Sequence, residues 1–161
     1  MIAAPAAGDV SVYESHDDHS ITEGDIVIVA DSDVAYETVL DYAKWTAIFP
    51  DIKQVTVTKK QGNDARVTFL HTDGNKDNVH FHNTPAAGMI WFEDTGGRAE
   101  VWAEIVFVPG EKAGTTRVHT RVYASVHGVT GLFVSDDKVK TLRTQRVRSE
   151  LHDLQAYFAK H

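Results

Sequence analysis

The alternation of apolar and polar residues marks out two strands near the start of the chain. Gly24–Ala30 holds the apolar run Ile26–Ala30 and is typical of a buried strand. Val10–Glu14 alternates more weakly and predicts a short leading strand. The apolar run stops at Asp31-Ser32-Asp33, side chains that favour the N-terminus of a helix, so a helix is expected to begin there.

Two helices are expected between this strand and residue 50. Ala35, Val39 and Ala43 recur at helical spacing and form one apolar face of the first helix. Trp45–Phe49 predicts a second, short helix. It is expected to end before Pro50, because a residue that precedes proline avoids the helical backbone region.

The middle of the chain has the pattern of an antiparallel meander. Apolar and polar residues alternate in six segments, separated by short stretches rich in glycine, proline, asparagine and aspartate. Short turns between successive strands favour antiparallel neighbours. The six predicted strands are Ile52–Lys60, Ala65–Thr72, Asn75–His82, Met89–Asp94, Arg98–Val108 and Thr115–Val126.

The last two of these strands predict a register for their own pairing. If Val108 faces Thr115, then Ile105 faces Val118, and the apolar sides of both strands coincide. The other side then carries complementary polar groups. This is the pattern of a sheet that has one covered face.

The chain ends in a segment that predicts a long helix. Ser135 is a plausible N-cap, and the region from there to about Ala159 contains neither proline nor glycine. Apolar residues at helical spacing form one stripe that is expected to lie on the sheet. The stripe consists of Val147, Leu151, Leu154 and Phe158.

Towards the N-terminus of this helix the same stripe meets Lys140 and Arg143. One hypothesis places a basic side chain at the wall of an apolar pocket, where it pairs with the carboxylate or polar head of a ligand. The alternative is that this half of the helix overhangs the sheet, so that both cations are solvated. The sequence leaves both open.

A local motif connects these elements to a known superfamily. Asp41-Tyr42 stands before Trp45, and the segment Ile48–Val55 follows at once. With the order of elements, this resembles the START-like (SRPBCC) helix-grip superfamily of polyketide cyclases and lipid-transport domains, over roughly Gly24–Lys160. The motif does not select one branch of the superfamily.

The resemblance implies an α+β helix-grip fold. It has a curved antiparallel sheet of about seven strands, two short helices after the first strand, and a long C-terminal helix. Residues 1–161 are then expected to form a single domain, with residues 1–9 as a flexible N-terminus. The resemblance also implies an apolar cavity between the sheet and the long helix.

Such a cavity would take its wall from the inward faces of the strands. The candidate ligand-binding residues are Val55, Val57, Val67, Phe69, Val79, Phe81, Ile105, Phe107, Leu132, Phe133 and Arg143. For the strand residues the alternative is an ordinary closed core. Leu132 and Phe133 lie in a glycine-flanked segment, where they act either as a lid over the pocket or as a plug of core.

Three functions follow from this picture. The first is binding or transport of a hydrophobic small molecule such as a lipid, an isoprenoid or a polyketide-like compound. The second is a cyclase or dehydratase that uses polar cavity residues such as His71 or Arg143 to polarise a carbonyl. The third is an interaction module with a vestigial cavity.

Composition excludes several other classes. The 161 residues include 16 basic and 23 acidic ones, and the net charge of −7 disfavours nucleic acid as a partner. The chain has no cysteine, so disulfides and thiolate chemistry are excluded. No apolar run approaches the ~18 residues of a membrane span. Met1–Gly8 lacks a complete secretory signal, so we expect a soluble protein that is either cytoplasmic or exported with a processed N-terminus. The sequence does not predict the oligomeric state.

Histidines are the candidates for further chemistry. His80 and His82 share one face of a strand, a spacing compatible with metal binding. Their neighbours Val79 and Phe81 are expected to look inward, so both histidines should face solvent; with no third ligand evident, neither a metal nor a cofactor is expected. His71 alternates in step with Phe69, so it is expected to point inward, where it is a speculative acid or base. A structural histidine is the favoured alternative. Phosphate-loop, nucleophile-elbow and zinc-protease motifs are absent, so catalysis is not favoured.

Overall fold

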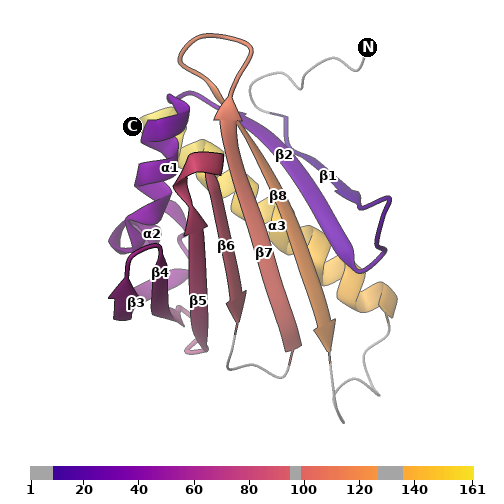
Figure 1. The fold of residues 1–161 in the computed structure, drawn as a ribbon. Helices are drawn as coiled ribbons and strands as arrows, with labels where there is room; N and C mark the ends of the chain where they lie inside the picture. The colour runs from indigo at the N-terminus through magenta and orange to yellow at the C-terminus, as the bar shows by residue number, and fades with distance from the viewer. Residues whose placement is uncertain (1–8, 95–98, 127–135) are drawn as a thin grey trace.

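One antiparallel sheet with a long helix across it organises the chain in the computed structural model (Figure 1). The structure describes residues 9–94, 99–126 and 136–161. Within them the sheet has 8 strands in the order β1-β2-β8-β7-β6-β5-β4-β3. The strands are β1 (Ser11–Glu14), β2 (Ile21–Ile28), β3 (Ile52–Gln61), β4 (Asp64–His71), β5 (Lys76–Thr84), β6 (Met89–Asp94), β7 (Ala99–Pro109) and β8 (Thr116–Val126). The helices are α1 (Ser32–Leu40), α2 (Trp45–Ile48) and α3 (Asp136–Lys160), with 3-10 turns η1 (Tyr42–Lys44) and η2 (Pro85–Ala87).

The predicted α+β class with a curved sheet and a C-terminal helix is confirmed, and the strand count is corrected. About seven strands were expected, and the described residues form 8. The eighth strand is β1, which the weak alternation of Val10–Glu14 predicted and the count of seven left out; it pairs with β2 from Ser11↔Asp25 to Glu14↔Thr22. Its alternation is weak because β1 is an edge strand with exposed and half-buried residues only.

The predicted pairing of the last two strands has the correct faces and the wrong register. Ile105 pairs with Thr120, where Val118 was expected, and Val108 pairs with Arg117. The ladder continues through Pro109, and the Gly110 amide donates to the Thr115 carbonyl at 2.9 Å, so the turn is shorter than predicted. Because the error is two residues, each side chain keeps its side of the sheet.

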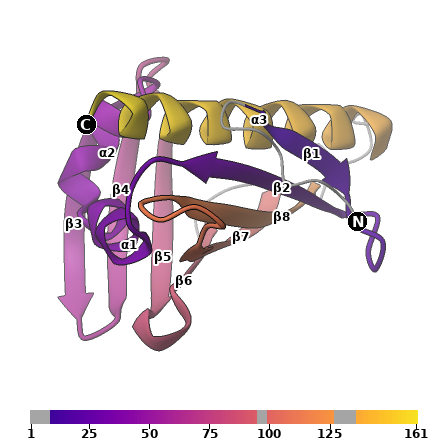
Figure 2. The same ribbon diagram turned by 90° about the horizontal axis from the view of Figure 1, so that it is seen from above.

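The predicted helices α1 and α2 form one connected unit beside the sheet. α1 begins at Ser32 with Asp31 as N-cap residue, and η1 joins it to α2. The indole Nε1 of Trp45 donates to the Val39 carbonyl at 2.8 Å, which fixes α2 against the end of α1. α2 lies against β3 near the C-terminal end of α3 (Figure 2), whereas α1 contacts β7 and β8.

Helix α3 packs closely on one side of the sheet. The predicted stripe of Val147, Leu151, Leu154 and Phe158 is buried. A Cβ atom added to Gly24 of β2 would lie 2.6 Å from Leu151 Cδ1 and 2.9 Å from Val147 Cγ1. Glycine therefore permits the close approach of α3 to β2. In the described part of the chain, no helix has the length and apolarity that a membrane span requires.

The sheet bends strongly, so that β3, β4 and β5 run at a steep angle to β2 (Figure 2). An aromatic cluster fills the space between these strands and α2. Its centre is Trp45, whose ring lies 4.9 Å from Phe69 and 5.5 Å from Phe81, measured between ring centroids. This cluster closes one end of the layer between the helices and the sheet.

Candidate ligand-binding pocket

A pocket of about 390 Å³ lies between α3 and the sheet, beside the aromatic cluster. Its wall comes from β4 to β8, from α3, and from the α2 region. Most of this wall is apolar, because the inward positions of the strands carry aliphatic and aromatic side chains. The apolar wall includes Trp45, Phe69, Val79, Phe92, Ala103, Ile105, Val122 and Leu154.

Only some of the candidate residues from sequence lie in this wall. Phe69, Val79, Ile105 and Arg143 line the pocket, as does His71. Leu132 and Phe133 lie outside the described residues. Whether the residues of the wall bind a ligand remains a prediction.

The other five candidates lie elsewhere. Val67, Phe81 and Phe107 are buried and do not line the pocket. Aromatic rings from the α1–α2 unit lie against two of them: Tyr42 lies 4.6 Å from Phe81 between centroids, and Tyr36 lies 5.9 Å from Phe107. Alternation identifies the inner face of a strand, but it does not indicate which part a helix covers.

Edge strand β3 supplies the last two of these residues. Val55 is half-buried, and Val57 is 45% exposed. The pairing of β3 with β4 is irregular between Val57 and Lys59, and neither valine borders the pocket. Both valines lie on an edge strand of the sheet, and their part in ligand binding stays a prediction.

Strand β8 supplies wall residues that were absent from the predicted site. Thr120, Val122 and Ala124 line the pocket opposite Ile105, Ala103 and Val101 of β7. The signal that identifies them is cross-strand pairing: the partner of a lining residue lies on the same face. Since the predicted register was two residues off, it would have indicated the right face and the wrong partners.

Arg143 is the notable polar group of the wall. The residue is 6% exposed, although arginine is rarely buried. Its Nε donates to Thr22 Oγ1 at 2.7 Å, and its Nη2 donates to the His19 carbonyl at 3.0 Å. Burial lowers the pKa of Arg143, while the charges of Glu14 and Asp18 act in the opposite direction. A guanidinium stays protonated under such conditions, so a positive charge is held at the wall.

The hydrogen-bond partners of Arg143 in the described part of the chain are all neutral oxygens. Among the described residues, no carboxylate lies within ion-pair distance of its guanidinium. Lys140, one turn away, is exposed and pairs with Glu14, and Arg146 pairs with Glu150 at 2.9 Å. Lys140 is therefore solvated, as the alternative expected, whereas Arg143 is buried at the pocket wall.

An acidic group lies at another part of the wall. His71 Nε2 is 2.6 Å from Asp77 Oδ2, and His71 Nδ1 is 3.3 Å from Asp51 Oδ2. Only a ring that carries hydrogen on both nitrogens donates to both carboxylates. This geometry favours a structural histidine, since neither nitrogen is left for a substrate proton.

Glu150 of α3 adds a further carboxylate near this group. Desolvation raises the pKa of Glu150, and the Arg146 guanidinium opposes the rise. Asp51, Asp77 and Glu150 all border the pocket. The wall is thus acidic near β4 and β5 and basic at Arg143, where α3 contacts β2 and β8.

Comparison with solved structures identifies the fold. The di-domain ARO/CYC protein BexL superposes with a TM-score of 0.74 at 22% identity over 85% of this chain, which spans 45% of BexL. A START superfamily protein from Mycobacterium smegmatis gives 0.71 at 14% identity, over 87% of this chain and 97% of that one. The ZhuI aromatase/cyclase from a Streptomyces species gives 0.71 at 17% identity, over 87% and 92%. No protein-family model matches the sequence, and no curated protein matches it.

The chain has the START-like helix-grip fold. The resemblance in the segment around Trp45 predicted this, and the order of strands and helices agrees with it. In this helix-grip structure α3 approaches β2 closely at Gly24, and residues of β4 to β8 line the pocket. At these identities the likeness identifies the fold, which hosts many activities.

Proposed function

We propose that this protein binds a hydrophobic small molecule that carries an acidic group. The apolar part occupies the pocket between α3 and the sheet, and the acidic group pairs with Arg143. The observation that carries the proposal is the buried guanidinium of Arg143 at an apolar wall, where its described partners are neutral oxygens.

Electrostatics supports an anionic ligand. A buried charge is costly unless it is paired and hydrogen-bonded, and neutral acceptors offset only part of that cost. A carboxylate, sulfonate or phenolate in the pocket would form a charge-assisted hydrogen bond with the guanidinium. Opposite-charge pairing of this kind is strongest where water is excluded.

Size and lining support an apolar body for the ligand. The volume of about 390 Å³ lies within the ~300–1,000 Å³ range of small-molecule sites. The wall offers aromatic and aliphatic contacts from β4 to β8. Fatty acids, acidic isoprenoids and aromatic polyketide-like acids share this chemistry, so the proposal extends to the class and not to one compound.

Ligand binding is tested first with the purified, full-length protein. Native mass spectrometry and organic extraction should reveal a co-purifying apolar acid, or the emptied protein should bind 8-anilinonaphthalene-1-sulfonate (ANS) at one site per chain. Dodecanoate should displace the dye. If no apolar molecule co-purifies and dye binding is neither saturable nor displaceable, the result would instead favour an interaction module with a vestigial cavity.

A cyclase-type activity is the second candidate, because Arg143 and His71 both border the same pocket. Arg143 would stabilise the negative charge that develops on a carbonyl oxygen during ring closure. The double engagement of His71 by carboxylates weighs against its use as a base. Incubation with poly-β-keto thioesters and mass spectrometry of products tests this: turnover lost in His71→Asn with dye binding retained would support catalysis, and no turnover in the wild type would reject it.

A further inference from the structure

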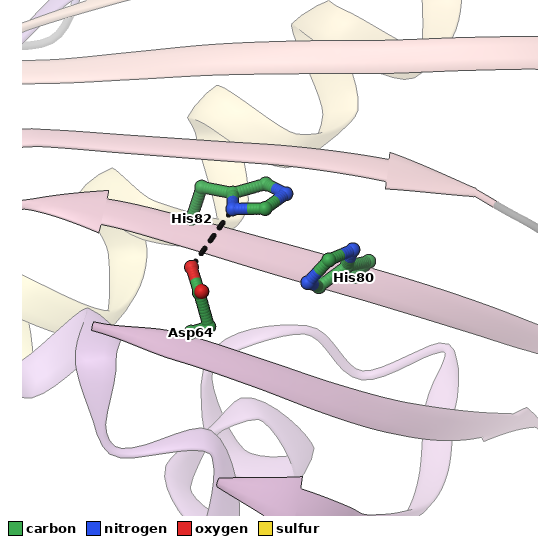
Figure 3. A group of neighbouring side chains, drawn as sticks. All are labelled: Asp64, His80 and His82. Carbon is green, nitrogen blue, oxygen red and sulfur yellow. Dashed lines mark hydrogen bonds and ion pairs between the residues drawn. The ribbon is translucent and has the colours of Figure 1, made fainter. Parts of the chain in front are cut away.

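A second cluster lies on the face of the sheet that is turned away from α3. It consists of Asp64 on β4 and of His80 and His82 on β5 (Figure 3). Asp64 and His82 are directly paired in the β4–β5 ladder. His80 is two residues from His82, so both imidazoles stand on the same face of the strand. Between and beside them, Val79 and Phe81 point to the buried face.

The donor atoms of the cluster are already close together. His82 Nδ1 lies 2.8 Å from Asp64 Oδ1, and the centroids of the two imidazole rings are 4.0 Å apart. One ligand atom from each of the three residues lies within 4.8 Å of the others. Side-chain rotation alone brings three such atoms around one ion, since paired strands hold the backbone in place.

We propose that Asp64, His80 and His82 bind a divalent transition-metal ion, with Zn²⁺ as the expected occupant. Two imidazole nitrogens and one carboxylate oxygen form a donor set that zinc sites use. Water completes the coordination, because the side chain of His82 is 41% exposed and that of Asp64 is 58% exposed. The site is separate from the ligand pocket and does not depend on the proposed function.

The charges around the cluster are mixed. Glu93 Oε1 lies 3.7 Å from His80 Nδ1 and adds negative charge beside that ring. Arg66 is the ladder partner of His80 and adds positive charge. With Asp64, two carboxylates and one guanidinium surround two imidazoles, so the local balance favours a cation. Without metal, the hydrogen bond between His82 Nδ1 and Asp64 Oδ1 holds the two side chains together, and a plain polar cluster is the competing account.

Zinc binding is measured by calorimetric titration of metal-free, tag-free protein with ZnCl₂. The expected result is one ion per chain. Replacement of a ligand, in His82→Ala or in Asp64→Asn, should weaken binding by more than about tenfold, since even groups behind the ligands contribute about 10–100-fold. His152→Ala, which removes an exposed histidine of α3, is the matched control and should bind like the wild type.

A spectroscopic measurement locates the ion. The Trp91 ring lies 5.0 Å from that of His82, between centroids. Cu²⁺, which prefers the same imidazole donors, should quench Trp91 fluorescence, and Trp91→Phe should abolish most of that quenching. Far-ultraviolet circular dichroism confirms that each variant is folded.

Two results would overturn the metal site. One is a wild-type protein that takes up no zinc, and the other is a set of folded His82→Ala and Asp64→Asn variants that bind zinc as the wild type does. Arg143→Met should keep zinc binding in full. Failure of the pocket proposal and failure of the metal proposal are thereby distinguished.

Discussion

Replacement of Arg143 by methionine isolates the contribution of its charge. Methionine keeps much of the apolar stem and removes the guanidinium, so the hydrogen bonds to Thr22 Oγ1 and the His19 carbonyl are lost. For an anionic ligand, the variant also loses the charge-assisted contact. The matched control is Arg148→Met, which makes the same change at an exposed position of α3 that does not border the pocket.

The magnitude follows from one contact. A hydrogen bond to a charged group contributes about 1.5–3 kcal/mol. Because about 1.4 kcal/mol is a tenfold change in Kd, Arg143→Met should weaken an anionic ligand roughly 10–100-fold. A neutral ligand of the same shape should bind within about twofold of the wild type, since 0.4 kcal/mol or so corresponds to that change.

The effect of Arg143→Met on the free energy of unfolding is the sum of two opposing contributions. Thr22 is 1% exposed, so the loss of the guanidinium donor to its Oγ1 costs about 1–3 kcal/mol, the usual cost for a buried group, whereas the His19 carbonyl belongs to an exposed residue. Removal of a desolvated charge offsets part of this cost. A net loss of about 1–2 kcal/mol in urea unfolding is therefore expected, which leaves the variant folded.

The assay is a fluorescence titration with two dyes that share one ring system. ANS carries a sulfonate, and N-phenyl-1-naphthylamine does not. Arg143→Met should lose affinity for ANS alone, and Arg148→Met should lose affinity for neither dye. Equal ANS affinity in the wild type and in folded Arg143→Met, or an equal loss for both dyes, would refute the assigned role of the guanidinium.

Three further changes probe the packing around the pocket. Gly24→Ala should lower the free energy of unfolding by about 1–3 kcal/mol in a urea titration, because its Cβ would meet Leu151 Cδ1 at 2.6 Å; an unchanged midpoint would contradict the close approach. Ala103→Phe should fill the pocket and abolish ANS binding while the protein stays folded; unchanged dye binding would place the site elsewhere. Burial alone would raise the pKa of Asp25, but hydrogen bonds from His119 and Tyr13 hold it below its usual range. The carboxylate therefore stabilises the fold above the unfolded-state pKa of about 3.9 and loses that effect as pH falls through the lower folded value. Asp25→Asn should be less stable than the wild type at pH 7 and should lose less stability between pH 5 and 2 in acid titrations. Parallel pH curves of the two proteins would contradict this.

The fold was largely predictable because its elements have strong local patterns. Leu151 and Leu154 repeat at helical spacing, and the meander strands alternate between clear turn signals. Strand β1 and the register of β7 with β8 were harder. An edge strand lacks a buried row, and the Pro109-Gly110 pair suggests a turn where the ladder in fact continues through Pro109.

The pocket was only partly predictable, for a physical reason. Alternation along the strands places Phe69 and Phe81 on the same inner face of the sheet. Phe69 nevertheless borders the pocket, whereas the Tyr42 ring covers Phe81. That distinction depends on how α1 and α2 pack on the bent sheet. Asp64 shows the same limit, since only the pairing of β4 with β5 brings it to His82.

The most direct test of the account is a titration of ¹⁵N-labelled protein with dodecanoate, followed by two-dimensional NMR. Binding in the pocket predicts saturable shifts of the Arg143 Nε–H signal and of the Ala103 and Val122 amides, at one ligand per chain. Dodecanol should shift the two amides and leave the guanidinium signal nearly unchanged. If dodecanoate leaves these three signals unmoved, or moves only residues on the outer face of the sheet, the pocket does not hold an apolar acid.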